Sequence, residues 1–228
     1  MENPYDNNKI CFIYCSNNDQ ILIQSLLALN TLHIPPGFTW EYRVLKNASC
    51  ITQAYNDGIN STNAKYKVYL HQDIIIINKN FLFDILTLFT KYPALGMMGV
   101  VGSKTLLPTD YNWVNSSSPY GKLYWGPNIN SLELLRWNEV TPDIELMQVV
   151  DGILMVTQYD LPWRADILRG WHFYDMAQCL EFARVGWAVG IPRQVEPWCW
   201  HLSHLMTGAG YDSERQIFLQ HYGPILAK

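Results

Sequence analysis

The sequence predicts an α/β fold in which a mostly parallel central sheet is covered by flanking helices. Strand-like and helix-like segments alternate from Lys9 to Tyr92, which is the order typical of a parallel sheet. The run Val68-Tyr69-Leu70 is apolar without polar alternation, as expected of a strand buried on both faces. A content of 49% hydrophobic and 16% charged residues is enough to build a sizeable core.

The first strand is expected at Lys9–Tyr14, followed by the small polar residues Cys15-Ser16-Asn17-Asn18. Such residues are typical of a strand-to-helix turn, where backbone N–H groups and side-chain amides can meet a ligand. A helix from Gln20 to Leu32 follows, with Asn18 or Asp19 as its N-cap. Its apolar side is predicted to carry Leu22, Leu26, Leu27 and Leu29.

The same alternation then continues. A strand is expected at Thr39–Leu45 and a helix at about Ile51–Asn60, and the next strand runs into His71-Gln72-Asp73. Periodicity predicts a strand, a helix and a strand after it, at Ile74–Ile77, Asn80–Tyr92 and Leu95–Val101.

From Pro108 to Asp143 the composition changes to Ser, Asn, Pro, Gly, Tyr and Trp, so we expect loops there. Loops of this length inside a compact domain are usually functional. Strands are expected again at Met147–Thr157, interrupted by Asp151-Gly152, and at Trp187–Ile191. The segment Trp198–His204 follows the last strand, and helices are expected at Asp175–Val185 and Asp212–Tyr222.

The bulk properties exclude several classes of protein. The 228 residues are most simply one domain, alone or with a substrate-binding extension. The formal charge of −4 comes without a basic run, so no nucleic acid partner is expected. No apolar run reaches the ~18 residues of a membrane span, and the acidic start at Met1–Asp6 is unlike a signal peptide. Five cysteines without CxxC spacing favour a reducing cytoplasm.

Two side chains at the end of the third expected strand are candidates for a metal site. His71 and Asp73 are two residues apart, so in extended backbone both leave the same face, at the edge where open α/β sheets bind ligands. His201 also follows a strand of what we expect to be the same sheet. A ligand set of one imidazole and one carboxylate favours Mn²⁺ over Mg²⁺ as a cation that would bind a diphosphate here.

Other interpretations of these residues stay open. A polar pair that simply faces solvent at the end of a strand would also explain His71 and Asp73. His201 lies between Trp200 and Leu202, which is also typical of a histidine packed in the core. Cys199, His201 and His204 have zinc-like spacing, but a second ligand cluster is missing, so structural zinc is disfavoured.

Trp171-His172-Phe173-Tyr174-Asp175 is a second candidate site. Asp175 is placed to cap the helix that begins there, where the helix dipole would hold its carboxylate ionised. An ionised carboxylate is a suitable general base, and capping does not exclude that role. Eight of the nine tryptophans follow residue 112, and a few of them beside the site would suit a carbohydrate, because indole faces stack on sugar rings.

Several motifs, in this order, resemble the family 2-like glycosyltransferases with a GT-A fold. They cover roughly Ile10 to Tyr222 and are Cys15-Ser16-Asn17, Ala54-Tyr55-Asn56-x-Gly58, Tyr69-Leu70-His71-Gln72-Asp73, Val150-Asp151-Gly152, Trp171-His172-Phe173-Tyr174-Asp175 and His201-x-Ser203. The resemblance is greatest to the branch in which His-Gln-Asp stands in place of the Asp-x-Asp metal motif. It implies a single domain over residues 1–228, with a nucleotide-sugar-binding half at about 9–105 and an acceptor-binding, catalytic half at about 106–228.

The resemblance also implies roles for individual residues. Asp73, with His71 and His201, would hold Mn²⁺ or Mg²⁺, and Asp175 would be the base of an inverting transfer. The donor-binding residues would be Cys15, Ser16, Asn17, Asn47, Asn56, Gln72, Asp151 and Gly152. Trp171 and His172 are expected on the acceptor side.

The implied function is metal-dependent transfer of a sugar from a nucleotide-diphosphate sugar, with a UDP-sugar favoured, in glycan or polysaccharide biosynthesis. The acceptor would be carbohydrate, lipid-linked or protein-linked, and a lipid-linked one would bring peripheral membrane contact without a transmembrane segment. The Gln-x-x-Arg-Trp motif of processive members is missing from the sequence, and Tyr55 stands where many relatives have Arg. A non-catalytic carbohydrate- or nucleotide-sugar-binding module is the alternative. A sugar-nucleotide pyrophosphorylase is disfavoured, because Cys15-Ser16-Asn17-Asn18 is not a Gly-rich phosphate loop.

Overall fold

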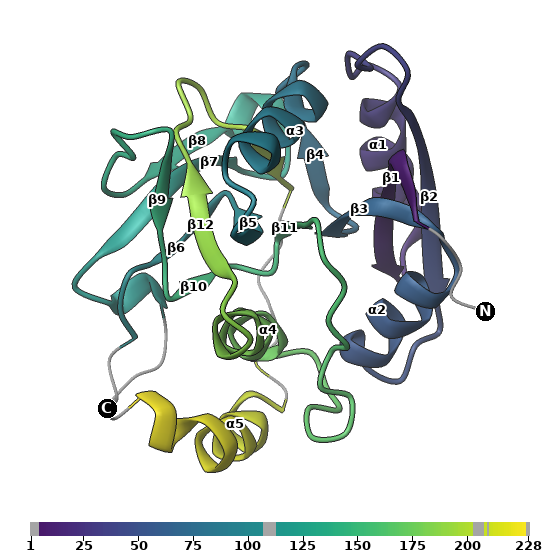
Figure 1. Cartoon of the computed structure of the whole chain (residues 1–228). Coiled ribbons are helices and arrows are strands. Elements are labelled where there is room, and N and C mark those ends of the chain that lie inside the picture. Colours follow the sequence, from purple (N-terminus) through teal and green to yellow (C-terminus); the bar gives the residue numbers. More distant parts are fainter. Residues whose placement is uncertain (1–4, 107–112, 203–207, 209, 227–228) are drawn as a thin grey trace.

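The computed structural model describes residues 5–106, 113–202, 208 and 210–226, and it has two sheets with helices around them (Figure 1). The larger sheet has the strand order β2-β1-β3-β11-β5-β12-β9. Its strands are β1 (Asp6–Ser16), β2 (Thr39–Lys46), β3 (Ala64–His71), β5 (Leu95–Gly99), β9 (Ile144–Leu146), β11 (Leu154–Thr157) and β12 (Ala188–Pro192). The predicted α/β class, with a central sheet and flanking helices, is confirmed.

The larger sheet is mixed in strand direction. β1 pairs in parallel with β2 and β3, and β12 pairs in parallel with β5. β11 lies antiparallel between β3 and β5, and β9 is antiparallel to β12. Because β1, β2 and β3 run the same way, with Cys15 opposite His71 and Ser16 opposite Lys46, their carboxyl ends meet at one edge.

The smaller sheet was not expected from the sequence. Its strand order is β10-β6-β7-β13-β4, with β8 paired to β7. The strands are β4 (Ile74–Ile76), β6 (Val101–Ser103), β7 (Pro119–Trp125), β8 (Glu133–Arg136), β10 (Val149–Val150) and β13 (Cys199–His201). The expectation of loops from Pro108 to Asp143 is therefore wrong, since β7 and β8 form an antiparallel pair within that segment.

The helices are α1 (Asp19–Leu29), α2 (Ile51–Asn60), α3 (Phe81–Lys91), α4 (Tyr174–Arg184) and α5 (Tyr211–Leu226). In Figure 1, α1 and α3 lie towards the top and α2, α4 and α5 towards the bottom. Short 3₁₀ helices span Trp113–Asn115 and Ile129–Ser131. Among the described residues, no helix combines the length and apolarity needed to cross a membrane.

Helix α1 begins as predicted, because the Asn18 side chain accepts hydrogen bonds from the backbone N–H groups of Gln20 and Ile21. Its predicted apolar side is only partly right. Leu22 and Leu29 are buried, whereas Leu27 is 62% exposed.

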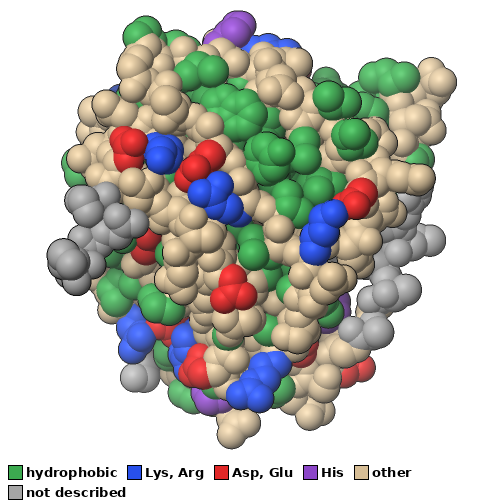
Figure 2. All heavy atoms as spheres, turned by 90° about the vertical axis from the view of Figure 1, so that its right-hand side faces the viewer, with side chains coloured by type: hydrophobic (Ala, Val, Ile, Leu, Met, Phe, Trp, Pro, Cys, Tyr) green, Lys and Arg blue, Asp and Glu red, His purple; other side chains and the backbone are tan. Residues whose placement is uncertain are grey.

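On the face shown in Figure 2, apolar area is mixed with scattered charges, and Lys and Arg side chains lie singly rather than as a basic patch.

Candidate active site

Three predicted metal ligands converge although they belong to different sheets. One ligand atom each from His71, Asp73 and His201 lies within 4.8 Å of the others, and His201 Nε2 is 3.2 Å from Asp73 Oδ2. The expectation that one sheet carries all three is wrong. His71 ends β3 of the larger sheet and Asp73 lies in the turn after it, while His201 belongs to β13 of the smaller sheet.

Strand pairing brings His201 to this position. β13 is antiparallel to β4 with His201 opposite Ile74, and the Leu202 N–H donates to the Asp73 carbonyl oxygen at 2.9 Å. On its other side β13 runs parallel to β7, with His201 opposite Trp125. His204, which completes the zinc-like spacing with Cys199 and His201, lies outside the described residues.

The electrostatics of this cluster suit cation binding. Burial lowers the pKa of His71, and the neighbouring His201 lowers it further, against the opposite effect of Asp73. Burial alone would raise the pKa of Asp73, but the hydrogen bond and charge of His201, with His71, bring that pKa below its usual value. The cluster therefore offers a neutral imidazole and an ionised carboxylate at neutral pH, and two nitrogens with one oxygen fit Mn²⁺ better than Mg²⁺.

The Tyr174 hydroxyl holds the ring of His71 in place, and Gly152 leaves room for that hydroxyl. The Tyr174 hydroxyl is 2.6 Å from His71 Nε2, and in the tautomer where Nε2–H donates to it, Nδ1 keeps its lone pair for a cation. A Cβ atom added to Gly152 would overlap the Tyr174 hydroxyl. Gly152 therefore leaves the space that this hydroxyl occupies.

Asp175 does not cap α4. The helix begins at Tyr174, after Phe173 in a left-handed conformation (φ 59°), and the cap position makes no side-chain hydrogen bond. The Asp175 carboxylate instead accepts hydrogen bonds from the Gly152 and Met176 N–H groups, each at 2.9 Å. It therefore ties the first turn of α4 to the segment between β10 and β11.

The expectation that Asp175 is held ionised is also wrong. Burial, and next the charge of Asp151, raise the pKa of Asp175 to about 7, against the two backbone N–H donors. The Asp151 carboxylate is held in place by the Trp113 indole N–H at 2.7 Å and the Ile153 N–H at 2.9 Å. A carboxylate with a pKa near neutrality is well matched to general-base chemistry.

Gln72 connects the metal turn to the turn after β1. Its side-chain oxygen accepts hydrogen bonds from Ser16 Oγ at 2.8 Å and from the N–H groups of Asn17 and Asn18 at 3.1 and 2.9 Å. Its amide nitrogen donates to Asn17 Oδ1 at 2.8 Å. The predicted donor residues Ser16, Asn17 and Gln72 thus form one hydrogen-bonded unit at the edge of the sheet.

The other predicted donor residues are arranged differently. Asn47 follows β2 in a left-handed conformation (φ 55°), next to the same edge. Both ends of the Asn56 side-chain amide bond the backbone of Trp163, at 2.8 and 2.9 Å, so this side chain joins α2 to a distant loop. Burial, with a contribution from Cys50, raises the pKa of the Cys15 thiol to about 11, which leaves it protonated.

The predicted acceptor residues Trp171 and His172 lie on a loop held by α5. The buried Glu214 side chain accepts a hydrogen bond from the His172 N–H at 2.7 Å and packs so closely on Gly170 that an added Cβ would overlap it. Trp171 is 48% exposed. The His172 ring packs edge-on against Tyr211 of α5, with centroids 5.3 Å apart.

A cavity of about 360 Å³ unites most of these groups. His71, His201, Asp151 and Asp175 line one part of it. The remaining wall is mainly aromatic and aliphatic, and includes Trp113, Leu123, Trp125, Leu135, Trp137 and Trp171. Tyr174 also lines the cavity, and sequence reasoning gave it no role.

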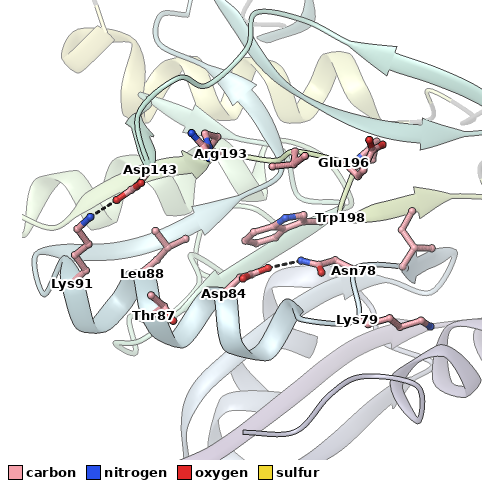
Figure 3. Close-up of a pocket in the computed structure, with 13 residues that line it drawn as sticks. Asn78, Lys79, Asp84, Thr87, Leu88, Lys91, Asp143, Arg193, Glu196 and Trp198 are labelled. Carbon is pink, nitrogen blue, oxygen red and sulfur yellow. Dashed lines mark hydrogen bonds and ion pairs between the residues drawn. The ribbon is translucent and has the colours of Figure 1, made fainter.

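A larger cavity of about 620 Å³ lies elsewhere, between α3 and the segment joining β12 to β13 (Figure 3). Its lining shares no residue with the cavity beside Asp175. Polar groups there bond one another, Asn78 with Asp84 at 2.7 Å and Lys91 with Asp143. The convergence of the metal cluster with Asp175 places the candidate active site in the smaller cavity.

Comparison with known proteins identifies the family and the fold. The model of a family described as "Glycosyltransferase like family" matches residues 11–222. A mannosyltransferase, PcManGT from Pyrobaculum calidifontis in complex with GDP-Man and Mn²⁺, is structurally similar with a TM-score of 0.58 at 12% identity over 100% of this chain. TarS 1–349 from S. aureus with UDP-GlcNAc (TM-score 0.54, 10% identity, 94% of this chain) and GalNAc-T7 with UDP, GalNAc and Mn²⁺ (0.55, 10%, 90%) are also similar.

The chain spans 68% of the PcManGT chain, 66% of TarS 1–349 and 45% of GalNAc-T7. None of the curated proteins compared with it is significantly similar in sequence. The structural neighbours establish the GT-A fold, and the family model covers nearly the whole sequence. The chain therefore belongs to the glycosyltransferase-like family and has a GT-A fold.

Proposed function

We propose that the chain transfers a sugar from a nucleotide-diphosphate sugar to a hydroxyl acceptor, in a metal-dependent reaction that inverts the anomeric centre. The observation that carries the proposal is that Asp175 and two members of the metal cluster, His71 and His201, line the same cavity. A base and a cation site facing one space are what a direct displacement at a sugar carbon requires.

In this proposal His71, Asp73 and His201 hold the cation, with Mn²⁺ favoured over Mg²⁺. When bound, such a cation supplies Lewis-acid neutralisation of the negative charge that a departing diphosphate develops. The donor is a nucleotide-diphosphate sugar, and a UDP-sugar is favoured because TarS 1–349 and GalNAc-T7 are both complexed with uridine nucleotides.

The proton transfer belongs to Asp175. Its carboxylate takes the proton of the acceptor hydroxyl while that oxygen forms a bond to the anomeric carbon, through an oxocarbenium-like state. The bond from the anomeric carbon to the diphosphate oxygen breaks on the opposite side, and the diphosphate leaves with the electron pair. One displacement with one carboxylate base gives inversion.

We place this reaction in the cytoplasm and in glycan or polysaccharide biosynthesis. All five cysteines are free thiols, which is the form kept in a reducing compartment. The acceptor would be carbohydrate, lipid-linked or protein-linked.

Replacing Asp175 by Asn tests the proposal. Transfer should fall by about 10²–10⁴-fold, because the amide cannot take a proton, while Mn²⁺-dependent nucleotide binding measured by calorimetry stays within a few fold. Asp73→Ala is the complementary variant and should lose the Mn²⁺-dependent part of nucleotide binding. Nucleotide binding without turnover in the unaltered chain would instead favour a non-catalytic binding module.

A further inference from the structure

The cavity beside Asp175 has an aromatic wall built by the second half of the chain. Leu123 and Trp125 come from β7, Leu135 from β8, and Trp137 follows that strand. Trp113 packs edge-on against Trp137, with centroids 5.1 Å apart. Trp171 lies at the same cavity on the loop held by α5. Flat indole faces of this kind stack on the C–H faces of sugar rings.

The ionisable side chains that line the cavity determine which charged groups it can accept. Its ionisable lining consists of His71, Asp151, His172, Tyr174, Asp175 and His201, so among the described residues no Lys or Arg lines it. The internal stretches outside the described ranges, 107–112, 203–207 and 209, contain neither Lys nor Arg in the sequence. An anionic acceptor group entering here would meet the carboxylates of Asp151 and Asp175, with no Lys or Arg among the described lining residues to neutralise it.

The nearest basic residues in the hairpin are directed elsewhere. Arg136 is exposed and follows Leu135 on β8, so its side chain leaves the opposite face of the strand. Lys122 of β7 pairs with Glu139 at 3.0 Å. The cation cluster lies at one side of the cavity, and an acceptor phosphate there would compete with the diphosphate of the donor.

We propose that the acceptor group entering this cavity is an uncharged sugar ring stacked on the indole wall, and that acceptors with a phosphate or carboxylate at the reacting end are rejected. This inference rests on the proposed glycosyl transfer and specifies its acceptor. The volume of about 360 Å³ is near the lower limit of small-molecule sites, about 300 Å³, which suits the end of a glycan or a glycoside. A phosphorylated lipid is thereby excluded as the group that receives the sugar.

The test compares matched neutral and anionic acceptors with the full chain, Mn²⁺ and a set of UDP- and GDP-sugars. Methyl glycosides of glucose, galactose, mannose and N-acetylglucosamine are measured against their 6-phosphates, the uronic acids and a short polyprenyl phosphate. We expect nucleotide release above the hydrolysis background to be at least 10-fold greater with a neutral glycoside than with its anionic counterparts. Equal or greater release with the anionic acceptors, or none with the neutral ones, overturns the inference.

A new positive charge should relax this selectivity. Val114, 43% exposed, lines the cavity, and Val114→Lys should raise the relative rate with the phosphorylated acceptor by about 10-fold. Leu134→Lys is the matched control, because Leu134 is 46% exposed on β8 and does not line the cavity. A similar change in both variants would mean that overall charge rather than the cavity sets the selectivity.

Direct binding separates this inference from the proposed function. Neutral glycosides should bind the chain in saturation-transfer NMR, and Trp171→Ala should weaken that binding at least 10-fold, with Trp171→Phe restoring most of it. Sugar binding without Mn²⁺-dependent nucleotide binding would refute the proposed transfer and keep the neutral-sugar site. Nucleotide binding without any preference for neutral sugars would refute the site alone.

Discussion

At the scale of single residues, the pair Asp151 and Asp175 is the most informative part of the molecule. Burial and the charge of Asp151 raise the pKa of Asp175 to about 7, while two backbone N–H groups favour its ionised form. The group is therefore near half-ionised at neutral pH. As a general base Asp175 acts only when ionised, so transfer should increase as the pH rises through about 7.

Asp151→Asn should move that increase to lower pH. Removing the neighbouring negative charge makes ionisation of Asp175 easier, so its pKa falls and the acid limb of kcat/KM against pH shifts down by about one unit. A pH–rate profile of both proteins measures the shift. Asp84→Asn, in the separate cavity beside α3, should leave the profile unchanged. An acid limb that stays in place in Asp151→Asn would mean that another group takes the proton.

At the scale of secondary-structure elements, α5 determines where the acceptor loop lies. Its Glu214 accepts the His172 N–H and fills the space beside Gly170, and Tyr211 packs on both His172 and Phe173. Phe173, with its left-handed backbone, also stacks on Phe218 of α5. The helix thus fixes the chain immediately before Tyr174 and Asp175.

Gly170→Ala should loosen this arrangement. The added methyl group would displace the Glu214 carboxylate and free the His172 N–H, so the loop shifts and transfer falls by up to about 10²-fold. Acceptor KM should rise, while calorimetry shows unchanged Mn²⁺-dependent nucleotide binding. Gly223→Ala in α5 is the control, since nothing lies within 4 Å of the Cβ that would be added there. An effect of equal size in both variants would contradict the positioning role of Glu214.

The elements were predictable to different degrees. The helix expected at about Ile51–Asn60 is confirmed, because its apolar positions recur with helical spacing. The β7 strand was missed, because Pro119–Trp125 contains glycine and lysine and buries only Gly121 and Leu123. Local patterns also could not show that β11 and β13 run between strands far away in sequence.

Some residues of the candidate site were also predictable from the sequence, and others were not. His71, Asp73, His201 and Asp175 were identified from motifs, and the structure brings them to one cavity or its edge. Tyr174 and Glu214 were missed, because their roles depend on contacts with His71 and His172, which lie 103 and 42 residues away. Such roles follow from tertiary packing and leave no local signal.

At the scale of the whole molecule, a buried ion pair connects a strand of the larger sheet to a segment distant in sequence. The Lys67 side chain of β3 is fully buried and its ammonium is 2.6 Å from Asp160 Oδ2. The Tyr5 hydroxyl donates to the same carboxylate at 3.0 Å, and the Lys67 ammonium lies 4.6 Å from the centre of the Tyr5 ring. The pair therefore joins the central strand β3 to the segment after β11 and, through Tyr5, to the first described residue of the chain.

Lys67→Met should destabilise the fold by about 3–5 kcal/mol, because Asp160 keeps a charge that has lost its buried partner. Urea unfolding followed by circular dichroism measures the change. Adding Asp160→Leu should recover part of the loss, since both charges are then gone. Lys46→Met, which removes an exposed pair with Asp19, should cost no more than about 1 kcal/mol. A loss that small for Lys67→Met would show that the buried pair contributes little.

The carboxamide of Gln72 has a consequence for how a ligand is received. By bonding Ser16, Asn17 and Asn18 at once, it links the turn before α1 directly to the turn carrying Asp73. The conformational entropy that is lost when these two segments are aligned is lost during folding, before any ligand binds. The sheet edge is preorganised, so a ligand that contacts both turns binds without first having to order them.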